Sequence, residues 1–85
     1  MPPRLEQPVE FRTLAVLVDD EPGVLARVVG LFSARGYNIE SLTVAHADRT
    51  ENRSRITIVT SGQALILDQI KAQLDRIVSV HQVLD

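Results

Sequence analysis

The sequence predicts an α+β domain in which strands and amphipathic helices follow the order β-α-β-β-α-β. Three observations support this prediction. Apolar residues alternate in some segments, recur every three or four residues in others, and turn residues separate the segments. Two right-handed β-α-β crossovers joined by a hairpin give a four-stranded antiparallel sheet with both helices on one face, the ferredoxin-like arrangement. The 85 residues suffice for one such domain.

Regular structure is expected to begin at Phe11. Residues 1–10 contain three of the four prolines and little apolar material, so they are predicted to be a flexible leader to a domain spanning residues 11–85. The first strand is predicted at Phe11–Val18, and both of its faces are fairly apolar, as is typical of a central strand. Its inward face is expected to carry Leu14, Val16 and Val18.

The first helix has clear start and stop signals. Negative charge stands before it at Asp19–Glu21, where the helix dipole favours a carboxylate by about 0.3–1 kcal/mol. Pro22 is expected in the first turn, and Gly36 fits the left-handed position that ends a helix. The stripe predicted to face the core, at i, i+3, i+4 and i+7 spacing, consists of Leu25, Val28, Val29 and Phe32.

The same rules predict the remaining elements. In chain order these are strands at Ile39–His46 and Arg55–Thr60, a helix from about Ala64 to Asp75 and a strand at Val78–Leu84. Ser61 and Gly62 are expected to break the third strand. The residues expected to face the core are Leu42, Val44, Ile56, Ile58, Leu67, Ile70, Leu74, Ile77, Val78 and Val80.

Composition excludes several kinds of chemistry. The chain has no cysteine, so disulfides and thiolate sites are ruled out. A net charge of -2 and a pI near 5.6 argue against binding to a phosphate backbone. No apolar run approaches the ~18 residues of a membrane span, and no secretory pattern is present. A cytoplasmic location is therefore expected.

No catalytic constellation can be recognised. His46 and His81 stand near predicted strand ends without an acidic residue at metal-ligand spacing, and no phosphate-binding glycine loop is present. Asp19–Glu21 could hold a cation, but adjacent carboxylates before a helix are more often partners of its dipole. RNA-recognition modules share this strand order, yet the third strand lacks the aromatic residues that stack on bases.

One segment of the chain resembles a known family. Asp20–Val44 reads D-E-P-G-V-L-A-R-V-V-G-L-F-S-A-R-G-Y-N-I-E-S-L-T-V, which resembles the ACT domain in the regulatory small subunit of acetolactate synthase, also called acetohydroxyacid synthase. Many amino-acid-sensing ACT domains share D-x-P-G-x-L, whereas R-G-Y-N-I-E-S-L-T-V is more specific to this subunit. The resemblance runs from about Leu14 through Ser61 and continues more weakly to the end.

The resemblance implies a non-catalytic subunit that mediates feedback inhibition of branched-chain amino-acid biosynthesis by valine, leucine or isoleucine. It implies no cofactor on this chain, because thiamine diphosphate, Mg and FAD would belong to the catalytic large subunit. Such ACT domains pair side by side as homodimers with effector sites at the interface. The alternative is a free-standing ACT module that regulates another enzyme or a transcription factor. An acylphosphatase-like hydrolase would need an Arg-bearing phosphate loop and a catalytic Asn that the sequence does not present.

The residues around the first helix suit such a site on physical grounds. The N–H groups of Gly23 and Val24 could bind a carboxylate, and a glycine lets the ligand approach the backbone. Asn38 and Ile39 of a second copy could supply an oxygen for the ammonium group, and Leu25 and Ile39 could line a pocket for a branched side chain. The alternative is that Gly23 and Asn38 are only turn and cap residues.

Position 20 departs from the family pattern, which usually has Asn where this chain has Asp20. An anionic Asp20 would strengthen contact with a ligand ammonium group but repel a carboxylate beside it. Valine is still expected to bind, because the backbone donors remain. Family members usually carry a second, C-terminal domain, so the chain is expected to be a truncated or stand-alone copy.

Overall fold

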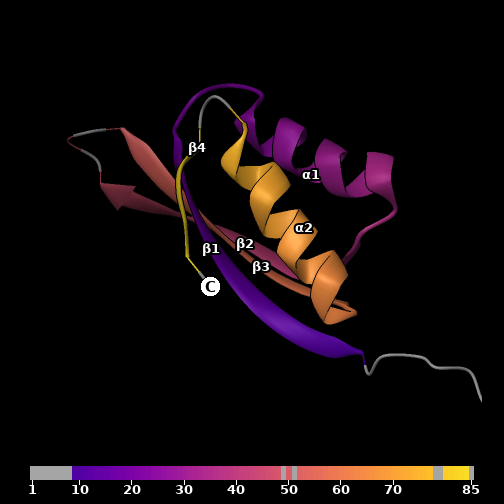
Figure 1. The fold of residues 1–85 in the computed structure, drawn as a ribbon. Helices are drawn as coiled ribbons and strands as arrows, with labels where there is room; N and C mark the ends of the chain where they lie inside the picture. The colour runs from indigo at the N-terminus through magenta and orange to yellow at the C-terminus, as the bar shows by residue number, and fades with distance from the viewer. Residues whose placement is uncertain (1–8, 49, 51, 78–79, 85) are drawn as a thin grey trace, which may run out of the picture.

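The computed structural model describes residues 9–48, 50, 52–77 and 80–84. Six elements follow one another: β1 (Glu10–Asp19), α1 (Val24–Arg35), β2 (Asn38–Asp48), β3 (Arg53–Gly62), α2 (Ala64–Asp75) and β4 (Val80–Leu84). Both helices lie over the same face of the sheet (Figure 1). The predicted α+β class with a ferredoxin-like fold is confirmed.

The sheet has the strand order β2-β3-β1-β4, and each neighbouring pair is antiparallel. β1 is therefore an inner strand, as its two apolar faces indicated. β2 lies at one edge, and no described strand pairs with its outer side. The register between β2 and β3 shifts between Ile39 and Ser41, which marks a bulge at Glu40.

The hydrophobic core lies between the sheet and the two helices. Alternate residues of β1 and β3 enter it from the sheet, and one face of each helix closes it. The buried cluster consists of Leu14, Val16, Val18, Val24, Val28, Phe32, Ile56, Ile58, Leu67, Ile70 and Leu74. Leu42 and Ile77 pack against it half-buried, as expected.

The predicted core stripe of α1 is partly wrong. The helix buries the row Val24, Val28 and Phe32. Leu25 and Val29, which were expected in the core, are 42% and 40% exposed. Val44 of β2, a large apolar residue that the sequence predicts to face inward, is also exposed, at 50%. The reason is that β2 is the edge strand, so no further strand in the described part of the chain lies beside it to cover these side chains.

The start of α1 also differs from the prediction. Gly23 is the N-cap, so Pro22 lies before the helix and none of the acidic residues Asp19–Glu21 is in its first turn. Gly36 ends the helix as predicted, with φ at +68° in the left-handed region. The N–H of the following Tyr37 donates to Phe32 O at 2.8 Å.

β3 is longer than predicted. Ser61 and Gly62 do not break it, because the long β1 pairs with both, at Phe11 and Glu10. β1 itself begins at Glu10, one residue before the predicted start. β2 likewise exceeds its predicted bounds, whereas α2 has the bounds predicted. Residues 1–8 of the predicted leader, and Val78, lie outside the described residues.

Candidate functional site

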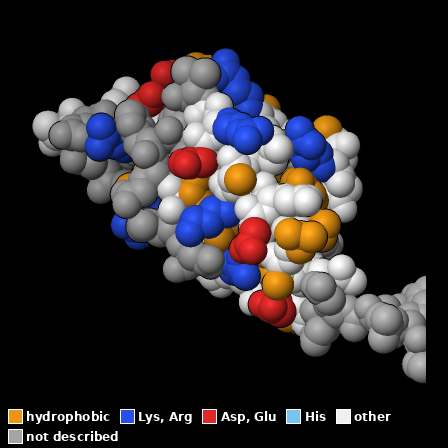
Figure 2. All heavy atoms as spheres, viewed as in Figure 1, with side chains coloured by type: hydrophobic (Ala, Val, Ile, Leu, Met, Phe, Trp, Pro, Cys, Tyr) orange, Lys and Arg blue, Asp and Glu red, His pale blue; other side chains and the backbone are white. Residues whose placement is uncertain are grey.

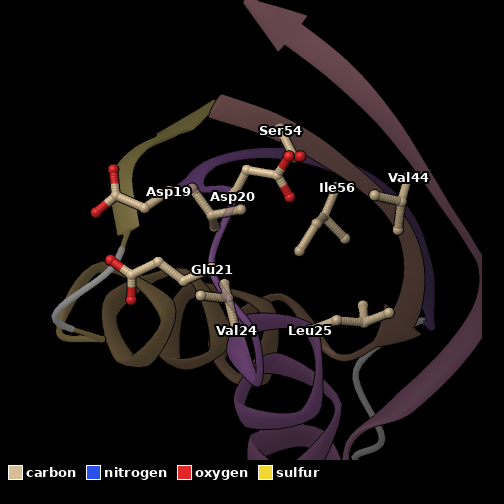
Figure 3. Close-up of a pocket in the computed structure, with 9 residues that line it drawn as sticks. Asp19, Asp20, Glu21, Val24, Leu25, Val44, Ser54 and Ile56 are labelled. Carbon is tan, nitrogen blue, oxygen red and sulfur yellow. The ribbon is translucent and has the colours of Figure 1, made fainter. Parts of the chain in front are cut away.

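A pocket opens where β1 ends and α1 begins (Figure 3). Its base is formed by the buried core residues Val18, Val24 and Ile56. Leu25 from α1 and Val44 from β2 form apolar walls that remain exposed to solvent. The complete lining is Val18, Asp19, Asp20, Glu21, Val24, Leu25, Val44, Ser54 and Ile56. The pocket can therefore bury a small aliphatic group beside polar backbone and carboxylates.

The three acidic residues at this pocket point in different directions. The carboxylate of Asp20 lies toward Ser54, whereas those of Asp19 and Glu21 extend to the opposite side (Figure 3). Asp20 Oδ2 lies 3.5 Å from His46 Nδ1, and both side chains are exposed. Such a pair adds little to stability. In the part of the chain that the structure describes, no three acidic or histidine side chains are grouped to hold a metal ion.

The backbone at the start of α1 is open to a ligand. Gly23 has φ at +87°, which glycine adopts without the strain that a side chain would bring. Among the described residues, no atom beyond its chain neighbours lies within 4 Å of the place where its Cβ would stand. The helix has no side-chain cap, and the Val24 N–H reaches Glu21 O only at 3.3 Å. The first-turn N–H groups can therefore bind an anion.

The corner after α1 lies at the other end of the helix. With 12 residues, α1 separates this corner from Gly23 by about 18 Å. Asn38 is exposed, and its Nδ2 donates to Ser61 Oγ at 2.7 Å and also to Glu40 Oε2. The side chain of Ile39 is half-buried and packs against the core.

Within one chain, the predicted site residues thus form two groups. Asp20, Val24 and Leu25 line the pocket, and Gly23 adjoins it through its neighbour Val24. Asn38 and Ile39 stand too far away for one small ligand to touch both groups. Sequence reasoning missed Val44 as a pocket wall and His46 as the partner of Asp20. The pairing of β2 with β3 brings these β2 residues to the pocket. The spacing of apolar residues along the sequence does not reveal which residues of the two strands pair.

Charge on the face of the molecule shown in Figure 2 is mixed. Basic and acidic side chains alternate there with apolar ones among the described residues, and neither sign dominates (Figure 2). This pattern differs from the basic patch of a nucleic-acid-binding domain. Among the described residues, neither helix is long and apolar enough to cross a membrane.

Comparison with known proteins links the chain to one family. The family model described as the AHAS small subunit-like ACT domain matches residues 14–82. The acetolactate synthase small subunit of Mycobacterium bovis is 52% identical over 73 residues, which are 86% of this chain and 43% of that protein. The acetolactate synthase isozyme 3 small subunit of Escherichia coli is 54% identical over 72 residues, which are 85% of this chain and 44% of that protein.

Solved structures give the same result for the fold. The acetolactate synthase small subunit of Thermotoga maritima superposes with a TM-score of 0.79 at 35% identity, over 88% of this chain and 46% of that one. The ACT domain of a GTP pyrophosphokinase from Chlorobium tepidum has a TM-score of 0.74 at 14% identity, over 91% of this chain and 97% of that one, and shows the fold alone. The chain spans less than half the length of the small subunits named here.

Proposed function

Because the chain belongs to the family of AHAS small subunit-like ACT domains, we propose that it is a non-catalytic regulatory module of acetolactate synthase that senses a branched-chain amino acid, foremost valine. It would control a separate catalytic large subunit, which would carry thiamine diphosphate, Mg and FAD. The observation that carries the proposal is a pocket with apolar walls at an uncapped helix start, in a chain of this family. A cytoplasmic location goes with this role.

The pocket has a suitable group for each part of the ligand. The carboxylate would accept hydrogen bonds from the first-turn N–H groups of α1, beside Gly23. The branched side chain would pack between Leu25 and Val44, which solvent now reaches. The ammonium group would lie toward Asp20, whose carboxylate lies toward Ser54, another lining residue (Figure 3).

Asn38 and Ile39 join this site in the proposal only through a second copy of the chain. β2 is an edge strand, and edges of this kind pair readily with another strand. If two β2 strands pair antiparallel about a two-fold axis, the start of one strand meets the far end of the other. Asn38 of one copy then approaches the pocket of its neighbour, near Val44. The exposed Leu25 and Val29 lie on the same side and would be covered.

Calorimetric titration of the chain with valine, leucine and isoleucine tests the proposal. We expect heat of binding with valine and a higher melting temperature in its presence. Alanine is the matched control, because it keeps both charged groups and lacks the branched side chain. If none of the three branched amino acids gives heat or a thermal shift, the proposed function is wrong.

The partner is tested separately by reconstitution with an acetolactate synthase catalytic subunit. Stimulation of acetolactate formation by the chain, and its reversal by valine, would support the proposal. If the chain binds valine but leaves the catalytic subunit unchanged, the alternative of a module that regulates another enzyme or a transcription factor is favoured.

A further inference from the structure

Three side chains form a closed hydrogen-bonded group on β2 and β3. Asn38 Nδ2 donates to Ser61 Oγ at 2.7 Å and to Glu40 Oε2. Ser61 Oγ in turn donates to Glu40 Oε2 at 3.1 Å. Asn38 pairs with Ser61 in the register of the two strands, and Glu40 stands at the bulge that follows. These contacts are separate from the pocket of the same chain.

The carboxylate of Glu40 determines which way the Asn38 amide faces. An ionised carboxylate only accepts hydrogen bonds, so it requires the NH₂ group of Asn38 and not its oxygen. The Ser61 hydroxyl gives its single proton to Glu40 and therefore also presents only lone pairs to Asn38. Both amide protons are thus used, and Asn38 Oδ1 accepts no hydrogen bond among the described residues.

The backbone oxygen of Asn38 is also engaged, because the Thr60 hydroxyl donates to it. The corner can therefore offer a ligand the side-chain oxygen Oδ1, which acts solely as an acceptor. Asn38 is exposed in the single chain, so this oxygen is accessible to a neighbouring copy.

We propose that Glu40 and Ser61 are positioning residues that hold Asn38 as an acceptor, and that this makes the site select 2-amino acids over 2-oxo acids. The inference rests on the proposed function, in which Asn38 of a second copy meets the ligand. An ammonium group donates to Oδ1, whereas the keto oxygen of a 2-oxo acid would face another acceptor and gain nothing.

Binding of valine and of 3-methyl-2-oxobutanoate, the 2-oxo acid with the same carbon skeleton, tests the inference by calorimetry. The wild-type chain is expected to prefer valine. In Glu40→Gln the amide of residue 40 can donate as well as accept, so Asn38 is free to turn. The valine-to-oxo-acid affinity ratio should then fall by about tenfold or more, as loss of a hydrogen bond to a charged group implies.

Two further substitutions separate orientation from charge. Ser61→Ala removes an acceptor without changing the charge and should lower the ratio in the same direction, whereas Ser61→Thr keeps the hydroxyl and should leave it unchanged. In the double variant Asn38→Asp with Glu40→Gln, residue 38 carries two acceptor oxygens however it turns, so the preference for valine should return. A purely structural role of Glu40 would predict no such rescue.

The outcomes distinguish this inference from the proposed function. If the wild-type chain does not bind valine, both are wrong. If it binds valine but the affinity ratio stays the same in Glu40→Gln, only the positioning role is overturned. The same holds if the ratio changes in Glu40→Gln but is equal in Ser61→Ala and Ser61→Thr. Circular dichroism and sedimentation check that each variant keeps its fold and association state. If Glu40→Gln does not fold, the pair of Ser61 variants decides the question by the same ratio.

Discussion

At the scale of single residues, Gly23 combines a backbone conformation that favours glycine with a place in the proposed binding site. Its φ of +87° disfavours any side chain, and the space that a Cβ would take is open. The left-handed conformation explains why a glycine is needed even without a ligand. The open space explains how a ligand could reach the N–H groups behind it.

Gly23→Ala should therefore reduce both stability and binding. An alanine in the left-handed region lowers the free energy of unfolding by about 1–2 kcal/mol, and its methyl group would stand in the approach to the helix start. Gly30→Ala is the matched control, because Gly30 lies inside α1 and, among the described residues, only its chain neighbours and the helix's own backbone can lie within 4 Å of its Cβ position. That change should stabilise the chain by up to about 1 kcal/mol. Urea denaturation measures the free energy of unfolding of the two variants. If both substitutions change it equally, the left-handed conformation of Gly23 does not matter for stability.

Asp20 is expected to affect the ligand more than the fold. Its contact with His46 is exposed, so Asp20→Asn should change the free energy of unfolding by less than about 1 kcal/mol. Valine affinity should fall a few-fold at low salt, since the carboxylate attracts the ammonium group, and the difference should shrink at high salt. Titrations at two ionic strengths measure this. Tighter binding by Asp20→Asn at low salt would show that repulsion of the ligand carboxylate is the larger effect.

At the scale of elements, α1 and β2 share an apolar surface that the rest of the described chain does not cover. Val29 and Leu25 stand on the helix and Val44 on the edge strand, each at least 40% exposed. The helical spacing predicts Leu25 and Val29 in the core. The sequence shows that this stripe of the helix is apolar, but it does not show which neighbouring element covers the stripe. A second copy at the β2 edge would give the stripe the contact it lacks.

Val29→Lys should weaken self-association without unfolding the chain. The side chain is 40% exposed and does not line the pocket, so a lysine there meets solvent in the single chain and an apolar surface in the proposed dimer. Leu65→Lys is the control, because Leu65 is 62% exposed on the other helix. Sedimentation equilibrium should show weaker association for the first variant only. If both variants associate like the wild type, the dimer does not use this surface.

At the scale of the whole molecule, binding and assembly should both appear in thermal stability. A ligand that binds only the folded chain stabilises it by about 2.7 kcal/mol at a hundred times its Kd. For a domain of this size that corresponds to a melting temperature raised by roughly 10–20 °C. If the site lies between two copies, the rise with valine should also depend on protein concentration. Differential scanning calorimetry at several protein concentrations, with alanine as control, measures this, and a concentration-independent rise would place the site within one chain.

Much of the fold could be predicted because its signals are local. The bounds of α2, the glycine that ends α1 and the inward residues of β1 follow from side-chain spacing and backbone preference within a few positions. The predicted bounds of an element are wrong where residues far away in the sequence determine them. Ser61 and Gly62 belong to β3 because β1 offers them partners about fifty residues earlier in the chain.

By itself, the sequence determined the element order and the left-handed glycine that ends α1, since these depend on neighbours along the chain. Only the tertiary structure decided that Asp20 meets His46, that Val44 walls the pocket and that Asn38 is held by Glu40 and Ser61. The physical reason is strand register. It brings residues far apart in sequence within hydrogen-bonding distance, and no local pattern of apolar residues specifies which pair will meet.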